Sequence, residues 1–203
     1  MIKWLNPVEL ETENILLIPM KWAHKTELLK ASLDGNLAEL WYTTIPQPGN
    51  IDQYFSKALD DFAADTGLAF VVYHKKLKVI IGTTRYLNAI PEHRRLEIGF
   101  TWYAKSFQRT FVNSECKLLL LTHAFEDLGA IAVEFRTHWF NFPSRNAILR
   151  LGAKQDGVLR NHQLLPDGTM RDTVVFSIIE SEWPACKRSL AVKIEQIHQS
   201  SHV

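Results

Sequence analysis

The stretch WYAKSFQRTFVNSECKLLLL, residues 102–121, decides the fold, because it carries the chain from an apolar strand through a polar turn into a long helix. A turn of this kind points unpaired backbone N–H groups and the positive end of the helix dipole at one spot. Phosphate groups bind at such spots. Arg109, Thr110, Asn113 and Ser114 could add donors, and Asn113 or Ser114 would cap the helix. An ordinary capped helix start remains the alternative.

The segments on either side of this turn predict a β-α-β unit. Residues 93–104 alternate as a strand does, with one apolar row formed by Leu96, Ile98, Phe100 and Trp102. Leucines recur at helical spacing over residues 113–128, and Gly129 ends that helix. A further strand covers residues 131–139. Two strands joined through a single helix are expected to run parallel.

The rest of the chain predicts further layers of the same α/β domain. Strands are expected at residues 14–20, 68–73, 78–87, 154–165 and 173–179, and helices at residues 21–34, 51–66, 143–152 and about 182–203. The Asp167-Gly168 pair indicates a hairpin turn. We expect one domain with a mixed central sheet of about six to seven strands and helices on both faces.

Composition excludes several classes of protein. The chain has 203 residues, 46% of them hydrophobic, and a net charge of +1 with acids and bases interspersed. Neither nucleic acid nor a membrane surface is an expected partner. Cys116 and Cys186 are far apart and the histidines form no HExxH motif, so we expect reduced thiols, no metal and a cytoplasmic protein. The first residues resemble neither a signal peptide nor a membrane span.

Two motifs and their order carry a family resemblance. Residues 96–100 read LEIGF and residues 141–153 read NFPSRNAILRLGA, in the order strand, turn, helix, strand and Asn-x-x-Ser helix. The chain resembles, over roughly residues 16–179, the GNAT superfamily of acetyl-CoA-dependent N-acetyltransferases. It is most similar to the branch of the ribosomal-protein N-terminal acetyltransferases, RimJ and RimL. The resemblance implies a single acetyltransferase domain over residues 1–203.

The resemblance also implies a coenzyme A site. The family turn has the pattern Gln/Arg-x-x-Gly-x-Gly/Ala and wraps the pyrophosphate with backbone N–H groups, which corresponds to Arg109, Thr110, Phe111, Val112, Asn113 and Ser114. Phe111 and Asn113 stand where glycines are expected. Either Phe111 keeps a negative φ with its ring turned away, or coenzyme affinity is reduced. Backbone groups near Thr101, Trp102 and Tyr103 would receive the pantetheine arm and thioester, and Asn141 would contact the arm.

Two side chains match the catalytic positions of the family. The resemblance gives Glu97 the general-base position, acting through water, on a strand face shared with Thr101 and Tyr103; a solvated surface glutamate is the alternative. Ser144 takes the position of an acid or hydrogen-bond donor to the departing thiolate, and a plain first-turn serine is the alternative. Many relatives place a tyrosine where this chain has Ile148.

The acceptor is expected to be a primary amine, either a protein N-terminus or a small molecule. Aromatic residues flank the acceptor cleft in relatives, and here these are Trp41, Tyr42, Trp139 and Phe140, with core packing as the alternative. His123 and His138 are expected to be satisfied structural histidines. A non-catalytic acyl-CoA-binding or regulatory domain is the second hypothesis, and a homodimer is left open.

Overall fold

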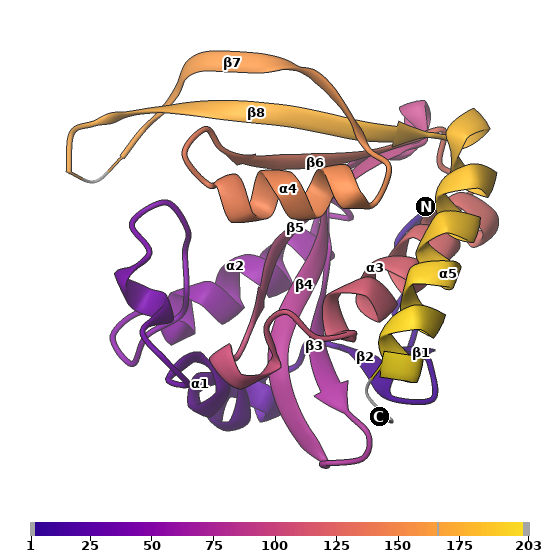
Figure 1. Ribbon diagram of the computed structural model, residues 1–203. Helices are drawn as coiled ribbons and strands as arrows, with labels where there is room; N and C mark the ends of the chain where they lie inside the picture. Colours follow the sequence, from indigo (N-terminus) through magenta and orange to yellow (C-terminus); the bar gives the residue numbers. More distant parts are fainter. Residues whose placement is uncertain (1–2, 166, 201–203) are drawn as a thin grey trace.

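A computed structural model describes residues 3–165 and 167–200, and its centre is one eight-stranded sheet (Figure 1). The strand order is β1-β2-β3-β4-β5-β6-β8-β7. The strands are β1 (Leu10–Glu11), β2 (Ile15–Pro19), β3 (Leu68–His74), β4 (Val79–Ile90), β5 (Arg95–Tyr103), β6 (Ala132–His138), β7 (Lys154–Leu164) and β8 (Met170–Ile179). The predicted α/β class is confirmed. The sheet has more strands than expected, and the two-residue β1 is too short to have a sequence signature.

Helices cover both faces of the sheet, as predicted. They are α1 (Lys25–Ser32), α2 (Ile51–Ala63), α3 (Val112–Thr122), α4 (Phe142–Arg150) and α5 (Trp183–Ser200). Leu120 of α3, Ile148 of α4 and Leu190 of α5 share one buried cluster, whereas Leu28 of α1 and Phe55 of α2 belong to another. The sheet therefore has an α3 face and an α2 face, which Figure 1 shows on opposite sides of β3, β4 and β5.

The sheet opens between β5 and β6, the one parallel pair of neighbours among the described strands. Their pairing covers just three positions, from Arg95 with Ala132 to Glu97 with Glu134. Beyond Glu97, β5 continues alongside β4 and β6 continues alongside β8, so the two strands separate (Figure 1). From Ile98 onward the β6-facing edge of β5 has no strand partner among the described residues. A strand edge of this kind leaves backbone N–H and C=O groups free for a ligand.

A bulge in β5 overturns the predicted single apolar row. Phe100 has a φ of 47°, and the register of β5 with β4 shifts nearby, between Thr83 and Arg85. Leu96 and Ile98 pack on the α3 face, but Trp102 packs on the α2 face. The extra residue of a bulge inverts the alternation that follows it. Glu97 precedes the bulge and alternates with Leu96 and Ile98, so it faces α2. Thr101 and Tyr103 follow the bulge and face α3, so the expectation that they share a face with Glu97 is wrong.

The α3 helix begins earlier than predicted. Phe111 is its N-cap residue, with no side-chain cap, and Val112 is the first helical residue. Asn113 and Ser114 lie in the first turn, so the expectation that either one caps the helix is wrong. A π-helical turn, His123–Asp127, extends α3 to Gly129, whose φ of 64° confirms the predicted stop.

Both cysteines are buried free thiols, in agreement with the sequence interpretation. Burial raises the pKa of the Cys116 thiol to about 12, which makes its thiolate scarce at neutral pH. Among the helices within residues 3–165 and 167–200, none is long and apolar enough to cross a membrane.

Candidate active site

Glu97 lies at the point where β5 and β6 separate. Glu97 is only 6% exposed, so the alternative of a solvated surface glutamate is wrong. The Nδ2 amide of Asn88 donates a 2.8 Å hydrogen bond to Oε2, and Arg136 Nε lies 3.6 Å from the same oxygen. Desolvation raises the pKa of Glu97 above its ordinary value, although Asn88 and Arg136 partly oppose that shift. A carboxylate in this environment is a stronger base at neutral pH than a surface glutamate.

The turn before α3 presents a row of bare amides. Within the part of the chain that the structure describes, the backbone N–H groups of five residues donate no hydrogen bond: Arg109, Thr110, Phe111, Asn113 and Ser114. The Val112 N–H is held by the Thr110 hydroxyl at 3.4 Å. Unpaired N–H groups at the start of an 11-residue helix fit a pyrophosphate. The residues present are therefore compatible with coenzyme A.

Phe111 follows the first of the two expected arrangements. Its φ is −63°, and the positive φ of the turn, 61°, is at Arg109 instead. The Phe111 ring packs with the rings of His74 on β3, at 5.9 Å, and His198 on α5, at 5.1 Å. The ring thus joins three elements of the α3 face, and the turn forms without a glycine.

We expect Phe111→Ala to lower the free energy of unfolding by about 1–2 kcal/mol, because a partly buried ring leaves a void between β3, α3 and α5. The acetyl-CoA Kd should change by less than about threefold, since the bare amides belong to the backbone. Urea denaturation and calorimetric titration measure the two quantities, and Phe111→Leu is the matched control. A large loss of affinity with unchanged stability would place the ring against the coenzyme.

The side chains of Thr101, Trp102 and Tyr103 are all engaged inside the protein. The Thr101 hydroxyl accepts a 2.7 Å hydrogen bond from Lys117 Nζ. The Trp102 indole donates to the Tyr54 hydroxyl at 3.3 Å, and the Tyr103 hydroxyl donates to Asn113 Oδ1 at 3.3 Å. The backbone edge of this segment has no strand partner on the β6 side, although the Tyr103 carbonyl accepts a 3.0 Å hydrogen bond from Gln108 Nε2. That backbone groups meet the pantetheine arm stays a prediction.

The start of α4 lies just beyond the end of β6. Asn141 is the N-cap residue, and its Oδ1 accepts a 3.1 Å hydrogen bond from the Ser144 N–H. The Ser144 hydroxyl makes no hydrogen bond with any described residue, so it is available to a ligand. Ile148 is buried in the core of the α3 face and offers no proton.

Aromatic side chains from two distant segments meet at the end of β6. The Trp41 ring lies 6.1 Å from Phe140 and 5.5 Å from Tyr42. Trp41 is 59% exposed, so core packing does not explain this cluster. Trp139 is not part of it, because its ring stacks instead against the Arg145 guanidinium at 4.5 Å. The cluster brings the loop before α2 next to the β6 arm of the opening.

His123 and His138, both expected to be structural, differ in how fully their ring nitrogens are hydrogen-bonded. His123 Nδ1 lies 3.2 Å from the Tyr86 hydroxyl, in agreement with a structural role. His138 packs under Trp41 at 4.8 Å, and its Nδ1 accepts a hydrogen bond from the Phe140 N–H. Its buried Nε2 has no partner among the described residues, so the expectation of a fully satisfied His138 is wrong.

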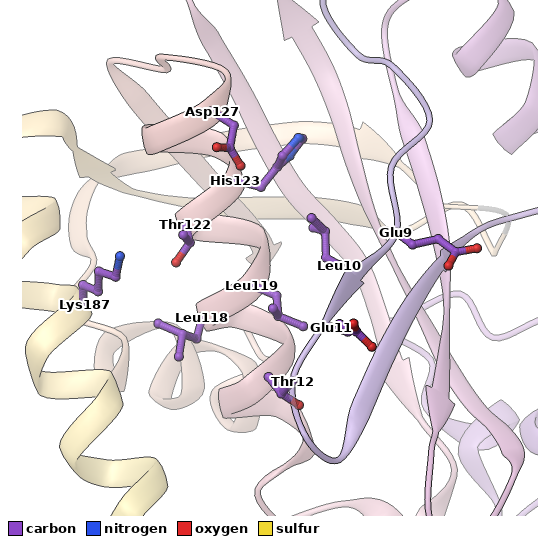
Figure 2. Close-up of a pocket in the computed structure, with 10 residues that line it drawn as sticks. All are labelled: Glu9, Leu10, Glu11, Thr12, Leu118, Leu119, Thr122, His123, Asp127 and Lys187. Carbon is purple, nitrogen blue, oxygen red and sulfur yellow. The ribbon is translucent and has the colours of Figure 1, made fainter.

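A separate groove of about 430 Å³ lies on the α3 face, between β1, α3 and α5 (Figure 2). Leu10 and Thr12 of the β1 segment, Leu119 of α3 and Lys187 of α5 are among its lining residues. None of the site residues expected from the sequence borders it. The candidate active site is the opening between β5 and β6.

Comparisons with known proteins point to one family. Residues 14–154 match the acetyltransferase (GNAT) domain. The chain is 28% identical over 114 residues to YoaA, an uncharacterized N-acetyltransferase of Bacillus subtilis, covering 56% of this chain and 63% of YoaA, which is less than two thirds. It is 28% identical over 149 residues to YdaF of the same organism, a candidate ribosomal N-acetyltransferase, covering 70% of this chain and 78% of YdaF.

A solved structure shows the same fold along nearly the whole chain. It is a GCN5-related N-acetyltransferase from Brucella melitensis, which superposes with a TM-score of 0.84 at 27% identity and covers 94% of this chain and 86% of its own. The domain match extends over most of the chain and includes the opening, the α3 turn and α4. The chain therefore belongs to the GNAT family of acetyltransferases.

Proposed function

We propose that the protein transfers an acetyl group from acetyl-CoA to a primary amine, by direct attack of the amine within a ternary complex. The observation that carries this proposal is the position of a buried carboxylate, Glu97, where the sheet opens. Bare amides at the start of α3 and the bare edge of β5 flank the same opening. A base, an anion site and a free strand edge together match the needs of acyl transfer from a thioester.

In this proposal the amides of residues 109–114 hold the pyrophosphate, and the edge of β5 beyond Ile98 holds the pantetheine arm, with Asn141 beside it. The coenzyme supplies the acetyl group as a thioester. A backbone N–H on the open edge of β5 is suited to stabilise the negative charge that develops on the carbonyl oxygen. The Phe111 ring packs against His74 of β3 and His198 of α5, so it is engaged within the protein.

Glu97 serves as the general base that accepts a proton from the ammonium group of the acceptor, through a water. Its raised pKa supports the role, since a base with a pKa nearer to neutrality combines better with an ammonium proton. The free hydroxyl of Ser144 donates a hydrogen bond to the departing thiolate.

We expect Ser144→Ala to lower kcat by about tenfold with little change in KM, because one hydrogen bond to a developing charge is lost. Steady-state kinetics on an accepted amine measure both constants. Ser144→Thr keeps the hydroxyl and should retain most of the activity. Equal kcat for Ser144→Ala and the parent protein would show that Ser144 does not donate a hydrogen bond to the thiolate, and water would be the donor instead.

The experiment that tests the function is a calorimetric titration with acetyl-CoA, followed by a thiol-release assay over a panel of amines and peptides. Binding with turnover of at least one amine supports an enzyme. Tight binding without turnover of any amine would favour the second function, an acyl-CoA-binding or regulatory domain. Phe111, Asn113 and Ile148 are the residues that favour this alternative, since each departs from the family pattern.

A further inference from the structure

Two buried side-chain atoms lack a hydrogen-bond partner among residues 3–165 and 167–200, and both lie on the α2 face. They are Arg85 Nε and His138 Nε2. Arg85 of β4 pairs with Gly99 of β5, two residues beyond Glu97, so its side chain lies on the same face as Glu97. His138 lies four residues beyond Glu134, the partner of Glu97, which places it on this face too. Unpaired buried donors are rare in folded proteins and require an explanation.

Arg85 is the more unusual of the two, because it is charged. The residue is 3% exposed, and it forms no ion pair with any described carboxylate. Its guanidinium packs against the ring of Tyr54, at 4.1 Å, and the ring of Phe100, at 4.9 Å. These two rings contact each other edge to face, with centroids 6.5 Å apart. One Nη2 hydrogen bond goes to the Tyr54 carbonyl at 3.3 Å. Ring contacts offset only part of the several kcal/mol that burying an unpaired charge costs.

Phe100 is the more exposed of the two aromatic neighbours of this guanidinium. The residue is 46% exposed, and its backbone lies in the β5 bulge, where the ladder with β4 is interrupted. Tyr54, the other aromatic neighbour of the guanidinium, is buried in the core of the α2 face. A rotation of the exposed Phe100 side chain would therefore open Arg85 toward the face that carries Glu97, without disturbing the core.

We propose that the acceptor amine carries a carboxylate, and that Arg85 binds this carboxylate while the amine lies at Glu97. The inference rests on the proposed function, whose acceptor it specifies. Arg85 lies on β4 opposite Gly99, so its backbone is displaced from that of Glu97 by about 7 Å along the strands and about 5 Å between them. This separation suits an acceptor with the dimensions of γ-aminobutyrate or a dipeptide. A guanidinium binds a carboxylate through charge-assisted hydrogen bonds, and an amide in the same place lacks the charge.

The test compares matched acceptors in the parent protein, Arg85→Gln and Arg85→Lys. The pairs are γ-aminobutyrate with 4-aminobutanamide and glycylglycine with glycylglycinamide, and the readout is the ratio of kcat/KM for the acid to that for the amide. We expect a ratio of about 10–100 in the parent protein, close to one in Arg85→Gln, and intermediate in Arg85→Lys. The acetyl-CoA Kd and the thermal melting midpoint of each variant report on the fold.

A ratio near one in the parent protein, or an unchanged ratio in Arg85→Gln, overturns the inference. If Arg85→Gln does not fold, inhibition of the parent protein decides: butyrate should compete with the acceptor, and butyramide should not. If no amine is turned over, the proposed function fails separately. Calorimetric binding of the same four compounds then tests Arg85, since equal affinity for acids and amides overturns the inference and a preference for acids supports it.

Discussion

Glu97→Gln is expected to lower kcat by about 100-fold or more while the acetyl-CoA Kd changes by less than about twofold. Glutamine keeps the size of the side chain, and its carbonyl oxygen can still accept the hydrogen bond from Asn88 Nδ2. It cannot accept a proton from the acceptor. Stopped-flow or steady-state thiol release measures kcat, and calorimetry measures the Kd.

The matched control is Glu134→Gln. Glu134 is the register partner of Glu97 on β6 and contacts the same Arg136, so the control removes an equal charge from the same face. Its kcat should stay within about threefold of the parent value. A Glu97→Gln variant as active as this control would remove Glu97 from the mechanism.

The pH dependence gives a second readout for Glu97. In the parent protein, kcat/KM should rise with pH through a pKa above the ordinary glutamate value, because desolvation favours the protonated form. Because the folded protein favours the protonated form of Glu97, proton binding at this residue adds to the free energy of unfolding at low pH. That contribution is lost as pH rises through the raised pKa. Glu97→Gln should lack both effects: it should lose the acidic limb of the rate profile and melt no lower than the parent protein at pH 7.

Elements governed by side-chain burial could be predicted from the sequence. The α3 leucines, the β-α-β order and the stop at Gly129 follow from periodicity and turn chemistry, and the structure has each of them. The bulge at Phe100 could not be predicted, because a bulky residue with positive φ has no sequence signature. That one residue puts Thr101 and Tyr103 on the face of the sheet opposite Glu97.

Sequence reasoning also missed two buried cations. Arg85 interrupts the apolar strand VIIGTTRYL, and Lys117 interrupts the apolar helix segment CKLLLL. A single charge inside an apolar run was the available signal in both cases, since charged residues are seldom buried without a partner. Their partners could not be predicted, because Tyr54 and Phe100 approach Arg85 from α2 and β5, and Thr84 and Thr101 approach Lys117 from β4 and β5.

Lys117 gives the largest expected effect on stability. The residue is 6% exposed, and its Nζ donates to the hydroxyls of Thr101, at 2.7 Å, and Thr84, at 3.4 Å. No described carboxylate forms an ion pair with it. Desolvation lowers the pKa of Lys117 to about 8, and the nearby Cys116 opposes this shift only in part. The folded protein therefore carries a penalty for the charged ammonium, which is fully present below pH 8.

The sign of the pH dependence follows from proton binding. Between pH 8 and about 10.5 the unfolded chain holds a proton on Lys117 that the folded protein has released, so the free energy of unfolding rises with pH. In Lys117→Met this rise is absent. We expect the parent protein to gain about 3 kcal/mol relative to Lys117→Met from pH 7 to pH 10.5, measured by urea denaturation at a series of pH values. The two lost threonine contacts affect the variant equally at every pH. The test of Lys117 is therefore the slope of the free energy of unfolding against pH. If the parent protein and Lys117→Met differ by the same free energy at every pH, the ammonium of Lys117 is not destabilised by burial.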